Sequence, residues 1–292
     1  MSKLIRFCLV LFAACLALPA SAKPATPPPA RPALWKVADA DTTIYLFGTI
    51  HALPKGVNWF NGEVARAFNR SQELVTEIAG AGDLKDKTLS IAMLPEGQTL
   101  RSLLAQRERE AFETALANLD MPAPAFDRFE PWYAAIALST MPLLKAGYGT
   151  EHGVEAALDA RAKALRRPHL GLETAEFQLN LFDSLPPDVQ KRYLNEIVEH
   201  MPTIRQELVA IVDTWKRGDA AKLAELMNAA EDNPVLVATL ITNRNRAWAE
   251  WVKTRMDKPG VVFLAVGAGH LAGAGSLQDQ LRTLGFTAAR VQ

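Results

Sequence analysis

Two histidines end the same short motif at opposite ends of the sequence. One motif is Gly48-Thr49-Ile50-His51 and the other is Gly267-Ala268-Gly269-His270. Each follows an apolar run that is typical of a buried strand. The glycines before each histidine allow a sharp turn and let a ligand approach the main chain. Two imidazoles at one edge of a sheet could ligate a metal ion or act as acid–base groups.

Two carboxylates occupy equivalent places after other predicted strands. Glu77 follows a strand at 74–75, and Glu173 follows a strand at 169–172. Ligands of open α/β sheets bind outside the carboxyl ends of the strands, so we expect both near the histidines. The sequence predicts His51, Glu77 and His270 as metal ligands, with Glu173 beside them. Non-functional alternatives remain for each residue. The histidines could be ordinary surface residues, Glu77 could be solvated, and Glu173 could simply be stabilised by a helix N-terminus.

Arg244 and Asn245 add a basic and an amide group. They lie in a predicted helix at 234–255, whose apolar stripe consists of Val237, Ile241, Trp248 and Val252. Arg244 falls on this stripe, where a guanidinium is costly unless it is paired. We expect it to bind the strand-end carboxylates, or an anionic group of a substrate or transition state. An arginine extending to solvent from the edge of the stripe is the alternative.

Alternating strand and helix patterns must position these groups. The strand patterns are at 34–37, 43–47, 73–78, 169–172 and 261–266, with a short one near the C-terminus. The helical patterns are at 63–68, 100–146, 154–165, 176–255 and 276–284. They predict an α/β fold with a mixed, mostly parallel central sheet flanked by helices. A large helical insertion separates the N- and C-terminal parts that carry the strands.

The N-terminus resembles an export signal. Basic residues and an apolar run to Leu18 precede Ala20-Ser21-Ala22. Residues 1–22 are therefore predicted to be a signal peptide that is cleaved after Ala22. Such a signal implies a secreted or periplasmic protein. An uncleaved anchor and a lipoprotein site at Cys15 are the alternatives. Residues 23–32 form a Pro-rich linker, and the domain spans 33–292. Both cysteines precede the cleavage site, so the mature chain has no thiolate ligand or nucleophile.

Composition narrows the possible partners. The 292 residues carry 32 basic and 32 acidic side chains, which gives no reason to expect a nucleic-acid partner. No apolar run in the mature chain is long enough for a transmembrane span. Gly-x-Ser-x-Gly, His-Glu-x-x-His and Walker motifs are absent, and the spacing after Gly267 does not suit nicotinamide binding. A peptide or a small-molecule substrate is expected.

Taken together, the motifs resemble those of the TraB/GumN family. The resemblance rests on both Gly-x-x-His motifs, on Gly171-Leu172-Glu173-Thr174 and on Arg244-Asn245, and runs from about Leu34 to the C-terminus. Relatives include Tiki proteases, described by two Gly-x-x-His motifs and a glutamate with divalent-metal dependence, erythromycin-esterase-like hydrolases, and ChaN-type haem- or iron-handling proteins. The family usually has Asp where this chain has Glu155, so the resemblance assigns Glu155 no role.

The resemblance and the residues support three hypotheses. The first is a metal-dependent, peptidase-like hydrolase that holds Zn²⁺, Mn²⁺ or Co²⁺. His51 and His270 would be ligands, and Glu77 would be the third ligand or the general base. Here Arg244 and Asn245 would stabilise an oxyanion, and Glu173 would lie beside them. The second is a metal-free hydrolase in which His51 is a general base against Glu77. The third is a non-catalytic module that binds haem, metal or peptide. The sequence predicts no substrate identity, oligomeric state or role for the helical insertion.

Overall fold

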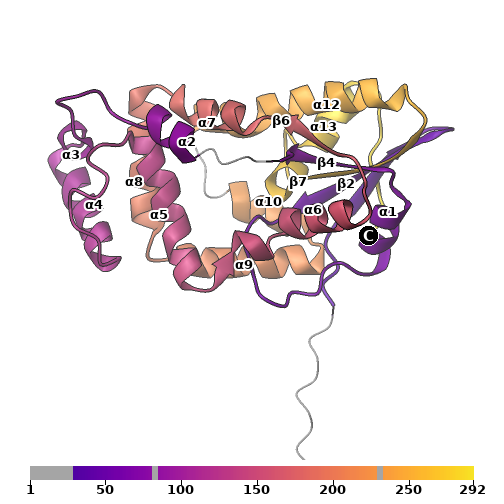
Figure 1. Ribbon diagram of the computed structural model, residues 1–292, viewed down its shortest axis with the longest axis horizontal. Coiled ribbons are helices and arrows are strands. Elements are labelled where there is room, and N and C mark those ends of the chain that lie inside the picture. Colours follow the sequence, from indigo (N-terminus) through magenta and orange to yellow (C-terminus); the bar gives the residue numbers. More distant parts are fainter. Residues whose placement is uncertain (1–28, 81–84, 229–232) are drawn as a thin grey trace, which may run out of the picture.

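The structure is a computed structural model that describes residues 29–80, 85–228 and 233–292. The predicted signal peptide and most of the Pro-rich segment lie outside these residues. The chain forms a central sheet at one end and a bundle of helices at the other (Figure 1).

The central sheet is mixed and mostly parallel, as predicted. Its strand order is β6-β4-β7-β2-β1-β8, and the first four strands run parallel. The strands are β1 (Leu34–Ala38), β2 (Thr42–Thr49), β4 (Glu73–Ile78), β6 (His169–Glu173), β7 (Gly260–Gly267) and β8 (Ala289–Arg290). β1 and β2, the strands predicted at 34–37 and 43–47, form a hairpin. Its turn is closed by the Asp39 carboxylate, which accepts from the N–H groups of Asp41 and Thr42. The apolar runs of β2 and β7 are buried because both faces of the sheet are covered.

Two sets of helices cover the sheet. One face carries α1 (Gly62–Arg70), α6 (Val154–Ala164), α9 (Ile204–Arg217) and α10 (Ala220–Asn228), packed around Phe47, Phe68 and Phe263. The other carries α12 (Asn243–Met256) and α13 (Leu277–Thr283), packed around Trp248 and Leu264. The alternation of strand side chains explains the two cores, because Phe263 and Leu264 are consecutive and point to opposite faces.

The helical insertion has its own core. It contains α2 (Lys85–Ile91), α3 (Leu100–Leu103), α4 (Gln106–Asn118), α5 (Pro131–Lys145) and α8 (Pro187–His200). Phe112, Leu116 and Leu138 are among its fully buried side chains. α7 (Ala175–Asp183) leads from the end of β6 toward this bundle (Figure 1).

Several local features were not predicted. A two-stranded sheet pairs β3 (Leu53–Pro54) with β5 (Tyr148–Gly149), and short 3-10 helices η1 (Thr150–His152) and η3 (Ala268–Leu271) follow β5 and β7. The helix predicted at 234–255 consists of α11 (Pro234–Val237), a π-helical turn η2 (Ala238–Thr242) and α12. Glu77 is the second-last residue of β4, and Glu173 is the last residue of β6, so both lie at the ends of the strands rather than after them. No helix in the described ranges combines the length and apolarity needed to span a membrane.

Candidate functional site

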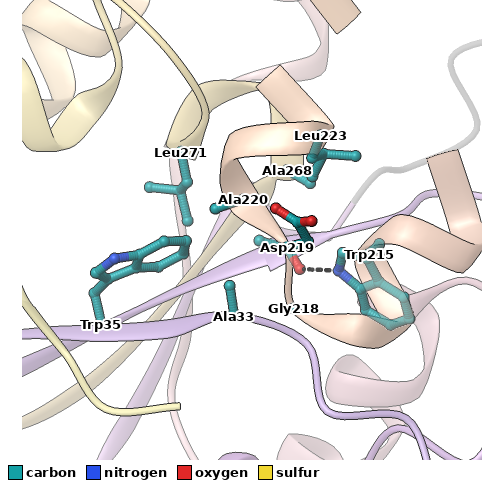
Figure 2. Close-up of a pocket in the computed structure, with 10 residues that line it drawn as sticks. Ala33, Trp35, Trp215, Gly218, Asp219, Ala220, Leu223, Ala268 and Leu271 are labelled. Atoms are coloured by element: carbon teal, nitrogen blue, oxygen red, sulfur yellow. Dashed lines mark hydrogen bonds between the residues drawn. The ribbon is translucent and has the colours of Figure 1, made fainter. Parts of the chain in front are cut away.

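The two glycine–histidine motifs begin side by side. β2 and β7 are neighbouring parallel strands, and Thr49 is paired with Gly267. A Cβ added to Gly48 would lie 3.1 Å from the Cα of Ala268, so glycine permits this close approach. From the opposite side, the Trp215 indole N–H donates to the Gly48 carbonyl at 2.8 Å, the bond drawn in Figure 2. The first motif is therefore held between β7 and α9.

His51, Glu77 and His270 meet around Gly267. A Cβ placed on this glycine would lie 3.1 Å from Glu77 Oε1, 3.5 Å from His51 Nε2 and 3.6 Å from His270 Cδ2. The Gly267 N–H also donates to Glu77 Oε1 at 2.7 Å. Side chains that are far apart in the sequence thus surround one point at the carboxyl end of the sheet, where the missing side chain of Gly267 leaves room.

Glu155 holds His51. The imidazole Nδ1 lies 2.6 Å from the Glu155 carboxylate, which also accepts from the Thr49 hydroxyl. The His51 side chain remains 64% exposed. Neighbouring protein atoms disfavour its charged form, but the hydrogen bond to Glu155 and the charges of Glu155 and Glu77 outweigh this effect and raise the pKa of His51 to about 9. The structure therefore gives His51 a partner other than the expected Glu77, and a titration above the near-neutral range.

Asn245 holds His270 in one tautomer. The Asn245 amide nitrogen donates to the Gly275 carbonyl at 2.8 Å, so its oxygen faces His270 Nδ1 at 2.7 Å and must accept from it. His270 Nε2 is then unprotonated and accepts from Arg244 Nη1 at 3.1 Å. Burial lowers the pKa of His270 to about 4, and the positive charge of Arg244 acts in the same direction. The negative charge of Glu77 opposes this change but does not outweigh it. Because both polar groups of Asn245 are engaged, we assign it to positioning His270 rather than to binding an oxyanion.

Arg244 is the charged centre of the network. Nε donates to Glu173, Nη2 donates to Glu77 at 2.6 Å and to Glu173 at 2.8 Å, and Nη1 donates to His270 and to the Leu240 carbonyl. All five N–H groups of the guanidinium therefore have acceptors. The pairing with strand-end carboxylates is the one expected from the sequence. An oxyanion could bind Arg244 only by displacing one of these acceptors.

Glu77 and Glu173 are largely buried carboxylates with several hydrogen-bond donors. Glu173 accepts from the Trp248 indole at 2.9 Å, and Gln178 Nε2 donates at 3.0 Å to each of the two carboxylates. Burial tends to raise the pKa of Glu77, but the charges of His270, Arg244 and His51, together with the Gly267 N–H, lower it to about 2. Hydrogen bonds and a paired guanidinium make such burial tolerable.

Gln178 and Trp248 were missed in the sequence. Trp248 lies four residues after Arg244, so both are on one helix face, and the guanidinium stacks 4.7 Å from the indole ring. From the sequence alone, this spacing indicates only that Trp248 belongs to the apolar stripe of the helix. Gln178 follows the N-cap residue Thr174 by one helical turn, which turns its amide toward the end of β6. Glu155, whose role the sequence left open, contributes directly.

The remaining histidines do not join this group. His169 contacts Asp159 and Thr76, and His200 contacts Glu207. His152 lies near Glu151. These three histidines therefore have structural or surface positions, as expected because none of them follows a strand predicted from the sequence.

The donor types suit a divalent cation, but their present spacing does not hold one. Each of His51 and His270 has Nδ1 beside an oxygen acceptor, which is how proteins orient imidazoles that bind metals through Nε2. However, the single lone pair of His270 Nε2 is taken by Arg244. Within the described parts of the chain, no three His, Cys, Asp or Glu side chains are close enough together to coordinate one ion.

Comparisons with known proteins agree on one family. The profile of the TraB/PrgY/gumN family matches residues 33–290. The uncharacterized protein YbaP of Escherichia coli (strain K12) is 25% identical over 239 residues, which cover 82% of this chain and 87% of YbaP. An uncharacterized protein of Treponema pallidum (strain Nichols) is 23% identical over 266 residues, covering 85% of this chain and 79% of that protein. No solved structure matches the chain significantly.

Proposed function

We propose that this chain, which belongs to the TraB/PrgY/gumN family, is a metal-dependent hydrolase that acts on peptide or amide bonds. The observation that carries the proposal is the meeting of His51, Glu77 and His270 around Gly267. Imidazole nitrogen and carboxylate oxygen are the ligands that catalytic Zn²⁺, Mn²⁺ or Co²⁺ sites use.

The charge of the cluster also favours a cation. The cluster contains three carboxylates and one guanidinium: Arg244 pairs with Glu77 and Glu173, while Glu155 pairs with His51. With both imidazoles neutral, the site holds an excess of negative charge in a partly buried place, which is unfavourable unless a cation joins it. The raised pKa of His51 reflects the same excess, because a proton on this imidazole partly offsets it.

Each polar residue then has a distinct task. His51, Glu77 and His270 would hold the metal, with Glu155 and Asn245 fixing the two imidazoles. A divalent ion held by these residues would supply an acidified water as the nucleophile. Glu77 could instead take a proton from attacking water as the general base. Arg244 favours the ionised form of Glu77 and donates hydrogen bonds to Glu173, and it would have to release His270 Nε2 for this imidazole to serve as a ligand.

A metal-free hydrolase is the second candidate, and the His51–Glu155 pair is the observation that favours it. A carboxylate 2.6 Å from Nδ1 orients the imidazole and leaves Nε2 directed toward Glu77 and Gly267. Such a pair can accept a proton from a nucleophile. Because the pKa of His51 is about 9, the rate would rise with pH up to that range.

Chelation separates the two candidates. The mature protein is screened against peptide and ester substrates, treated exhaustively with a chelator, and then given Zn²⁺, Mn²⁺ or Co²⁺. Loss of hydrolysis with recovery on metal addition supports the metal-dependent enzyme. Full activity after chelation supports the His51–Glu155 mechanism. Stoichiometric metal with no turnover of any substrate would indicate a binding module instead.

We also propose that the chain is exported. The support is the basic start, apolar run and Ala-Ser-Ala sequence of residues 1–22. N-terminal sequencing of protein recovered outside the cytoplasm should give Lys23 as the first residue. A start at Cys15 would identify a lipoprotein.

A further inference from the structure

A large apolar cavity lies against the charged network. Its volume is about 590 Å³, and Glu173 and Arg244 form part of its wall. The other walls are mainly apolar, from Leu172, Phe177, Leu181, Ala247, Trp248 and Trp251. Apolar clefts of this size with a few convergent polar groups are characteristic of ligand sites.

We infer that this cavity binds a large apolar, preferably aromatic, side chain of an extended peptide substrate. The inference deepens the proposed function, since it names a substrate feature for the same site. Phe177 is 46% exposed on α7, the helix that follows β6, and α12 supplies a second aromatic lining residue, Trp251. Aromatic rings contributed to the lining by two different helices suit a flat apolar group.

The cavity adjoins the proposed reaction centre through shared side chains. Arg244 lines the cavity and donates to both Glu77 and His270. Trp248 also lines it, and its ring lies 4.4 Å from the His270 ring. A side chain seated in the cavity would therefore contact Arg244 and Trp248, the two residues that pack against His270, which is the position of a specificity pocket beside a reaction centre.

The adjoining sheet edge suits an extended backbone. β6 is the terminal strand of the sheet in the described residues. The Leu74 N–H donates to the Pro168 carbonyl, so the alternation of a parallel ladder points the backbone N–H and C=O groups of His169 and Gly171 outward. Leu170 is 48% exposed on this strand, which ends at the cavity residues Leu172 and Glu173. An added peptide strand would satisfy these outward groups and lead its side chain to the cavity.

Binding without turnover tests the inference separately from the proposed chemistry. N-acetyl-phenylalaninamide and N-acetyl-alaninamide are titrated into the full mature protein by calorimetry. The phenyl probe should bind about tenfold or more tightly, because burying a phenyl group removes much more apolar surface from water than burying a methyl group. Equal affinities would overturn the inference even if the protein proves to be a hydrolase.

Two variants locate the binding. Ala247→Trp should fill the cavity and abolish the preference for the phenyl probe, while Phe177→Ala should weaken phenyl binding several-fold without blocking the cavity. Ala117→Trp, on the exposed surface of α4 and outside the cavity, is the matched control and should bind as the parent does. An unchanged preference in Ala247→Trp with a normal thermal midpoint would place the probe elsewhere. A stable dimer by sedimentation that masks Phe177 and Trp251 would assign the surface to a second copy and overturn the proposal.

Discussion

Asn245 fixes His270 by a 2.7 Å hydrogen bond to Nδ1, and its own amide is fixed by Gly275. The pair lies on α12 and η3, so the orientation of a residue in one motif depends on a helix from another part of the sequence. Oriented imidazoles of this kind bind metals better than free ones because less rotational freedom is lost.

Asn245→Ala should therefore weaken metal binding by about 10–100-fold. It should also destabilise the fold by about 1–3 kcal/mol, since the partly buried Gly275 carbonyl and the buried His270 Nδ1 lose partners. Metal titration and urea unfolding measure the two effects. The exposed Asn118→Ala is the control. Parent-like metal affinity in Asn245→Ala would remove the positioning role.

Gly267→Ala tests whether the site lies at Gly267. The backbone there has φ −48°, which alanine can adopt, but its Cβ would approach Glu77 Oε1 and His51 Nε2. We expect a modest loss of stability, about 1–2 kcal/mol, and at least about a tenfold loss of metal affinity. Activity and affinity equal to those of the parent would show that the reaction centre is elsewhere.

Arg244→Ala should be among the most destabilising substitutions. It leaves the buried carboxylates of Glu77 and Glu173 without their cation, which costs about 3–5 kcal/mol. Arg246→Ala, two residues along and exposed, should change the unfolding free energy by less than about 0.5 kcal/mol. Equal effects of the two substitutions in urea unfolding would contradict the network described for Arg244.

Glu155→Gln should lower the pKa of His51 from about 9 by at least about one unit, as followed by NMR of the imidazole in metal-free protein. The folded pKa lies above the ordinary value of 6.5, so protonated His51 stabilises the fold fully below pH 6.5, and this stabilisation is lost as pH rises through about 9. The parent should therefore exceed Glu155→Gln in stability at pH 6 by more than at pH 9.5. A constant difference across this range would show that Glu155 does not act through the charge of His51.

Much of the fold could be predicted because periodicity records burial. The unbroken apolar run that became β7 and the stripe that became α12 both reflect contact with the core. The π-helical turn before Asn243 and the short β3–β5 pair could not be predicted, because tertiary contacts determine them and no local signal marks them.

The site was only partly predictable for a similar reason. His51, Glu77 and His270 stand at strand ends, where parallel topology brings them to one edge. Which residues contact these three side chains depends on the directions in which neighbouring side chains point. Glu155 reaches His51 from the start of α6, and Gln178 reaches Glu77 from α7, contacts that strand and helix patterns do not contain.

The metal content of the mature protein tests the central proposal most directly. Parent and His51→Ala/His270→Ala proteins are equilibrated with Zn²⁺, Mn²⁺ or Co²⁺, freed of unbound ion, and analysed by mass spectrometry of the metal. The account predicts about one ion per parent chain and almost none in a folded double variant. A double variant that retains the ion, or a parent that hydrolyses substrate while holding none, would contradict it.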